Sequence, residues 1–126
     1  MIVTGLFLAE KATVIDGKLH VWGGVLDYWT VGADRIAEFA LVILVQAEPG
    51  DTDWTIGLEL RSPNGVAIDL PSASCPDAEA GENRFACPTF TAQFPDDGRH
   101  VFIATTTSRS GESTAAVGVE IRSAPQ

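Results

Sequence analysis

Short apolar stretches separated by tight-turn residues constrain this sequence more than any other feature. Three turns are well marked: Asp16-Gly17, Ser62-Pro63-Asn64-Gly65 and Pro95-Asp96-Asp97-Gly98. Asp-Gly between two β-prone stretches is typical of a type I′ hairpin turn, in which both central residues need a positive φ. Turn residues punctuate strands in this way, and no window of a dozen residues carries a helical period. The rhythm therefore predicts an all-β protein.

The apolar patterns of the strands predict how deeply each is buried. Apolar and polar or small residues alternate between Trp54 and Leu60, which is typical of a half-buried antiparallel strand and places Trp54 in the core. The run from Phe39 to Gln46 does not alternate, so we expect it to lie centrally in a sheet or to be covered on both faces. Further strands are expected over residues 2–10, 13–15, 18–22, 25–31, 66–70, 89–94, 101–107 and 115–121.

The spacing of these stretches predicts the architecture. About eight or nine strands at roughly ten-residue spacing are typical of a sandwich or barrel, and 126 residues are the size of one domain. We expect a single domain over residues 1–126, an antiparallel β-sandwich with an immunoglobulin-like or jelly-roll Greek-key arrangement. The segment from Pro71 to Asn83 is small, acidic and aperiodic, which predicts a surface loop.

Charge and hydropathy exclude several partners. The chain holds 17 acidic and 8 basic residues, for a formal net charge of −9. Such a surface repels phosphate backbones, so no nucleic-acid partner is expected. No stretch approaches the ~20 apolar residues of a spanning helix, and the start of the chain lacks the basic flank and cleavage site of a signal peptide. We therefore expect a cytoplasmic protein without membrane insertion.

Two cysteines, Cys75 and Cys87, lie in one polar segment. A disulfide between them could close this loop, whereas a reducing cytoplasm would keep both thiols free. A zinc site would need two further ligands, and neither His20 nor His100 stands at metal-ligand spacing from a cysteine. No metal or other cofactor is expected.

The stretch Asp16-Gly17-Lys18-Leu19-His20-Val21-Trp22-Gly23-Gly24 resembles a signature, Asp-Gly-Lys-Leu-x-Val-x-Gly-Gly, near the start of a family of small uncharacterised bacterial all-β proteins. The strand 58–60 before Asn64-Gly65 is similar to the middle of that family, and residues 98–102 are similar to a late strand of it. The resemblance implies a compact all-β domain without an assigned activity. The segment from Pro71 to Pro88 departs from the family pattern, and no functional residue is carried over.

The sequence contains no recognisable catalytic motif. A hydrolytic triad needs a histidine base, which only His20 and His100 could supply. We expect both to be solvated, His20 because it lies on the strand face opposite Leu19 and Val21. No nucleophile elbow, phosphate loop or zinc-protease motif occurs, so the chain is expected not to be an enzyme. The acidic residues of turns and loops are interpreted as turn-forming and solubilising, with a calcium site as the alternative; they are Asp51, Asp53, Asp77, Glu79, Glu82, Asp96 and Asp97.

Aromatic residues gather at Trp22, Tyr28 and Trp29. With Phe39 and Leu41 of the unbroken apolar run, they form the candidate interaction surface, because Trp and Tyr are enriched in protein interfaces. The alternative is that these rings are core aromatics packed under a loop. We interpret the chain as a non-enzymatic protein-interaction module that forms a homo-oligomer or binds another protein. The alternative function is a small-ligand or carbohydrate-binding module that uses loop-end carboxylates and an exposed Trp.

Overall fold

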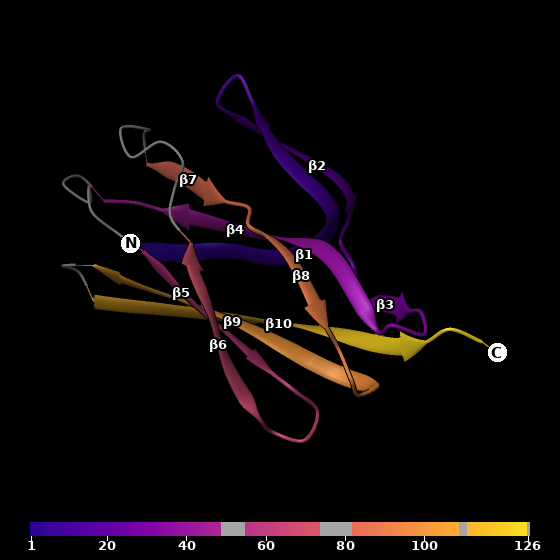
Figure 1. The fold of residues 1–126 in the computed structure, drawn as a ribbon. Coiled ribbons are helices and arrows are strands. Elements are labelled where there is room, and N and C mark those ends of the chain that lie inside the picture. The colour runs from indigo at the N-terminus through magenta and orange to yellow at the C-terminus, as the bar shows by residue number, and fades with distance from the viewer. Residues whose placement is uncertain (49–54, 74–81, 109–110, 126) are drawn as a thin grey trace.

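The fold is a sandwich of two five-stranded sheets (Figure 1). The structure is a computed structural model, which describes residues 1–48, 55–73, 82–108 and 111–125. The first sheet contains β1 (Ile2–Ile15), β2 (Lys18–Gly24), β4 (Ile36–Gln46), β7 (Asn83–Ala86) and β8 (Thr89–Gln93). The second contains β3 (Tyr28–Val31), β5 (Ile56–Arg61), β6 (Ala67–Ala73), β9 (Gly98–Ser108) and β10 (Gly111–Ser123).

The strand order confirms the expected sandwich and selects its immunoglobulin-like form. The first sheet runs β2-β1-β4, with β7 and β8 both antiparallel to β4, and the second runs β3-β10-β9-β5-β6. The chain therefore changes sheets between β2 and β3, β3 and β4, β4 and β5, β6 and β7, and β8 and β9. The last three crossings are those of immunoglobulin-like domains. The ladder is not purely antiparallel, because the short β3 runs parallel to β10. The described residues form ten strands in place of the expected eight or nine.

The unbroken apolar run lies in β4, at the centre of the first sheet, as predicted. β4 has β1 on one side and β7 and β8 on the other. In the middle of the strand both faces are covered, and Ala40, Leu41, Val42 and Ile43 have no exposed surface. The core between the sheets centres on Phe39. Its ring lies 5.7 Å from that of Trp29, 5.9 Å from that of Phe94 and 5.7 Å from that of Phe102, centroid to centroid.

Asp16 and Gly17 form the predicted hairpin turn. Their φ values are 52° and 71°, and Ile15 pairs with Lys18 across the turn. The two positive φ values and this pairing match a two-residue type I′ turn. The expected gap between the strands 2–10 and 13–15 does not exist, since β1 is continuous.

The hairpin extends beyond the rest of its sheet. β1 pairs with β4 only from Ile2 to Ala9. Ala9 pairs with both neighbouring strands, and from Lys11 to Ile15 β1 pairs with β2 alone. Residues 9–24 therefore form a two-stranded projection from the sandwich (Figure 1). We call this segment the arm.

The segment expected as a loop, from Pro71 to Asn83, contains strand residues at both of its ends. β6 continues to Ala73, so the loop expected from Pro71 is strand over its first three residues, and β7 begins at its last residue, Asn83. Residues 74–81 lie outside the described part of the chain. Trp54, which was expected in the core, also lies outside it.

Candidate functional site

The structure separates the aromatic residues that the sequence placed together. Trp22 lies on the arm and is 47% exposed, and Tyr28 lies on β3, in the other sheet, and is 51% exposed. Trp29 is adjacent to Tyr28 in sequence, so its side chain points the opposite way along the strand and packs against Phe39 in the core. The three rings therefore do not form one surface.

Phe39 and Leu41 correct the expected interaction surface. Their side chains are 1% and 0% exposed and belong to the core between the sheets, so the folded chain does not present them to a partner. On the opposite face of β4, Ile36 at the start of the strand is 48% exposed, whereas the middle of the strand is covered. Ala40 and Val42 are small and fully buried there, and the strand register places the larger Phe7 beside Val42.

One face of the arm is aromatic and cationic. Lys11 pairs with Trp22, Thr13 with His20, and Ile15 with Lys18, and residues that face each other across a ladder share a face. The Lys11 Nζ atom lies 5.5 Å from the centroid of the Trp22 ring, within the range of a cation–π interaction. The His20 ring stacks on Trp22 with a centroid separation of 6.2 Å and an interplanar angle of 26°.

The arm also exposes aliphatic side chains and a sheet edge. Val14 and Ile15, next to the turn, are both exposed. β2 is the terminal strand of its sheet, and no strand in the described ranges pairs with its outer side. An unpaired edge with apolar neighbours is a template for another strand. The arm therefore combines an unpaired sheet edge with exposed aromatic and aliphatic side chains.

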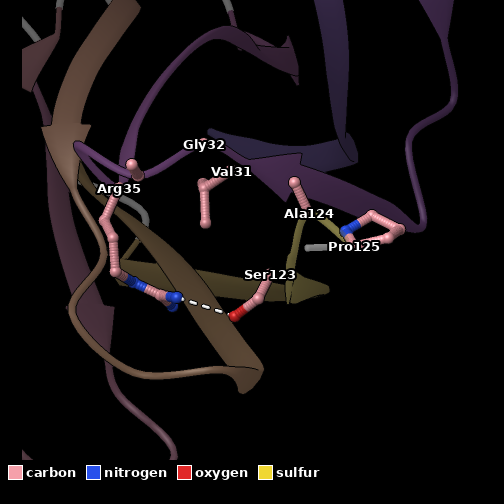
Figure 2. A pocket seen from close by; sticks show the side chains of 7 residues that line it. Val31, Gly32, Arg35, Ser123, Ala124 and Pro125 are labelled. Atoms are coloured by element: carbon pink, nitrogen blue, oxygen red, sulfur yellow. Dashed lines mark hydrogen bonds between the residues drawn. The ribbon is translucent and has the colours of Figure 1, made fainter.

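A polar cluster lies at the C-terminal end of β10, where Arg35 donates a hydrogen bond to Ser123 (Figure 2). Its Nε donates to the Phe94 carbonyl at 2.7 Å, its Nη1 donates to Ser123 Oγ at 2.8 Å, and its Nη2 contacts Asp97 Oδ1 at 2.6 Å. Hydrogen bonds from Arg35 and then from Ser123 hold the pKa of Asp97 below its ordinary value. Nothing in the sequence pattern signalled Arg35, because its partners lie about 60 to 90 residues away.

A shallow cavity of about 390 Å³ lies beside Arg35 (Figure 2). Its lining is mostly small or apolar and consists of Val31, Gly32, Ala33, Arg35, Ser123, Ala124 and Pro125. The one charged group in this lining is already neutralised by Asp97. We therefore assign Arg35 a structural role in fastening the loops rather than a role in anion binding.

His100 is buried, contrary to the expectation that it is solvated. It is 3% exposed because its strand register pairs it with the inward-facing Val119. Its Nδ1 lies 3.1 Å from the Gly98 carbonyl oxygen, and its ring meets Phe94 edge-on with a centroid separation of 5.1 Å. His20 is exposed, as expected, and lies in the other sheet. The two histidines therefore do not share a site.

Cys87 lies between β7 and β8 and is half-buried. Burial raises the pKa of this thiol, which disfavours the reactive thiolate at neutral pH. Cys75 lies outside the described residues, so the disulfide between the two stays a prediction.

Within the described ranges, no three His, Cys, Asp or Glu side chains gather as they would around a metal ion. Asp51, Asp53, Asp77 and Glu79 of the acidic loops lie outside those ranges. The same ranges contain no helix long and apolar enough to cross a membrane.

Comparison with known proteins finds similarity only among solved structures. No protein-family model and no curated protein sequence matches the chain. The crystal structure of the CARDB domain of the PF1109 protein from Pyrococcus furiosus, in complex with di-metal ions, is similar with a TM-score of 0.45 and 14% identity, over 96% of this chain and 92% of that one. The solution NMR structure of the same domain gives a TM-score of 0.41 and 13% identity, over 97% and 98%. Scores and identities this low say nothing about function, and the resemblance of the hairpin sequence to a bacterial family stays a prediction.

Proposed function

We propose that this protein is a non-enzymatic interaction module that self-associates through the arm. The observation that carries the proposal is the exposure of Trp22 and Ile15 on a hairpin that projects from the sandwich. A two-stranded hairpin is only marginally stable in water by itself. A partner that covers the arm would bury these side chains and stabilise it.

The chemistry of the remaining surface supports a binding role over a catalytic one. Arg35 and Asp97 satisfy each other, and His100 is buried with its ring packed edge-on against Phe94. The acidic net charge of −9 disfavours nucleic acid as the partner. A second copy of the chain, in the cytoplasm, is the partner that we propose.

Solution mass tests this function. We expect light scattering behind size exclusion to give a mass above 13.3 kDa that rises with protein concentration. Trp22→Ala should raise the protein concentration at which half of the chains are dimeric by about tenfold, because a central interface aromatic typically contributes more than 1 kcal/mol.

Tyr28→Ala is the matched control, since Tyr28 is equally exposed but lies on the other sheet. It should leave the mass unchanged. A monomer at every concentration would disprove the function, and equal effects of the two variants would disprove the role of the arm.

Carbohydrate binding is the second candidate, and the stacked pair of Trp22 and His20 favours it. A half-exposed aromatic ring offers a flat apolar face to a small ligand. If this candidate is correct, a sugar should raise the melting temperature of the monomer, and Trp22→Ala should abolish that increase. Self-association without any thermal shift across a panel of common sugars would decide against it.

A further inference from the structure

We infer that two copies of this chain join edge to edge, through antiparallel pairing of β2 with β2 of the second copy. The inference rests on the proposed self-association and specifies how it is made. The contact is made by backbone groups of the arm rather than by its side chains.

The hairpin turn decides which backbone groups of β2 are free. A two-residue type I′ turn makes its flanking residues, here Ile15 and Lys18, a hydrogen-bonded pair. Hydrogen-bonded and non-hydrogen-bonded pairs alternate along an antiparallel ladder. The backbone groups of His20 therefore point toward β1, and those of Leu19 and Val21 point away from it. No described strand accepts these outward groups, because β2 is terminal in its sheet.

The usual devices that protect a sheet edge are weak along this strand. Natural edges are blunted by proline, bulges, charges or very short strands. The stretch from Lys18 to Trp22 has no proline and one charged residue, which stands at its end. Gly23, with φ at 63°, interrupts the regular edge beyond Trp22. The pairing segment is thus Lys18–Trp22, and its midpoint is His20.

This midpoint sets the geometry of the pair. A two-fold axis through His20 pairs Leu19 of one copy with Val21 of the other, twice, and satisfies the outward amides of both strands. His20 then faces His20 of the second copy as a non-hydrogen-bonded pair. Trp22 faces Lys18 of the second copy, which allows a second cation–π interaction in addition to the one with Lys11.

Charge identifies the occupant as a second copy. The arm contains two acidic and two basic residues, Glu10, Asp16, Lys11 and Lys18, so it has no formal net charge, whereas the whole chain carries −9. Two such chains meet with the least repulsion at their arms. Antiparallel pairing also places the sandwiches of the two copies at opposite ends of the paired β2 strands. Six residue steps from Ala9 to Ile15 span about 20 Å, which exceeds the Debye length of about 8 Å at physiological salt.

Amide hydrogen exchange tests the pairing. We expect exchange at Leu19 and Val21 to slow by at least about tenfold between mainly monomeric and mainly dimeric protein, because edge pairing gives their free amides a partner. His20 and Trp22 already donate to β1 and should change much less. A dimer without this alternating protection would overturn edge pairing while leaving the proposed function intact. Absence of any dimer would overturn both.

Disulfide trapping provides a second test with a matched control. With both native cysteines replaced by serine, His20→Cys places a thiol at the two-fold axis, where a non-hydrogen-bonded pair brings Cα atoms to about 4.5 Å, a distance that suits a disulfide. Thr13→Cys lies opposite on the same face but on β1. We expect His20→Cys to form covalent dimers at least about tenfold faster than Thr13→Cys. Equal rates for the two variants would overturn the inference.

Discussion

Arg35 shows how much of this fold depends on a single side chain. It adopts a φ of 58°, a conformation that L-residues rarely take. Its guanidinium fastens the turn before β9 to the end of β10, and its carbonyl accepts a hydrogen bond from the Phe94 amide at 2.8 Å. These contacts hold the backbone of Arg35 in an otherwise unfavourable region.

The partner of Arg35 makes stability depend on pH. The pKa of Asp97 is lowered in the folded chain, first by the hydrogen bond from Arg35 and then by that from Ser123. A lowered carboxyl pKa stabilises the fold above the unfolded value and loses that contribution as the pH falls. We expect Asp97→Asn to lower the urea midpoint at pH 7 relative to the parent. The difference should shrink as the pH falls below the ordinary value of 3.8.

Asp96→Asn is the control for this titration, since it removes an exposed charge from the same turn. Its difference from the parent should be small at neutral pH and should not follow the Asp97 profile. A gap between parent and Asp97→Asn that stays constant down to the lowest pH would contradict the role of Arg35.

At the scale of the element, the arm is the least supported part of the described structure. β2 pairs with β1 alone, and five of its seven residues are exposed. Elements with few buried contacts open locally at low free-energy cost. The turn chemistry of Asp16 and Gly17 therefore contributes much of what keeps the arm ordered.

Gly17→Ala isolates this contribution. Gly17 has φ at 71° and no atom within 4 Å of an added Cβ, so the cost is conformational and amounts to about 1 kcal/mol. We expect amide protection at Thr13 and His20 to fall about fivefold in the monomer, which is what 1 kcal/mol gives. The urea midpoint of the sandwich should move little.

Gly57→Ala in β5 is the matched substitution, because an added Cβ there would lie 3.7 Å from the Thr105 carbonyl oxygen and φ is not positive. It should leave arm protection unchanged. If Gly17→Ala lowered the global midpoint as much as it loosened the arm, the arm would not be an independent element.

At the scale of the whole molecule, charge separates the arm from the body. The arm is formally neutral, and the body carries the entire net charge of −9. This distribution leaves an acidic chain with one projecting surface that carries no formal net charge. Long-range repulsion between exposed charges is screened by salt, so the charge of the arm should decide how association responds to salt.

Lys18→Glu tests this distribution. The change lowers the formal net charge from −9 to −11 and places all of the added negative charge on the arm. We expect the association constant to fall about tenfold at low salt and to recover partly at high salt, because the new repulsion is electrostatic and screened. Equilibrium sedimentation at two salt concentrations measures both effects.

Arg61→Glu produces the same net charge on the second sheet, away from the arm. Its exposed ion pair with Glu59 contributes little to stability. We expect association and its salt dependence to stay close to those of the parent. If the two variants weakened association equally, net charge rather than the arm would control it.

The sequence by itself determined the local structure. The Asp16-Gly17 turn, the alternation that puts Val119 and Ile121 in the core and the central place of β4 were all predictable. They follow from the positive φ values of the turn and from the two-residue period of a strand. The same period explains why Tyr28 and Trp29 point in opposite directions.

Only the tertiary structure decided which side of each strand is inside. β3 leaves the sheet of β2 and pairs parallel with β10, which separates Tyr28 from Trp22. The inward register of His100, the burial of Phe39 and the joining of Arg35 to Asp97 likewise depend on contacts between distant segments. Periodicity defines two faces of a strand but does not say which one meets the opposite sheet, because strand register and sheet pairing are set by long-range contacts.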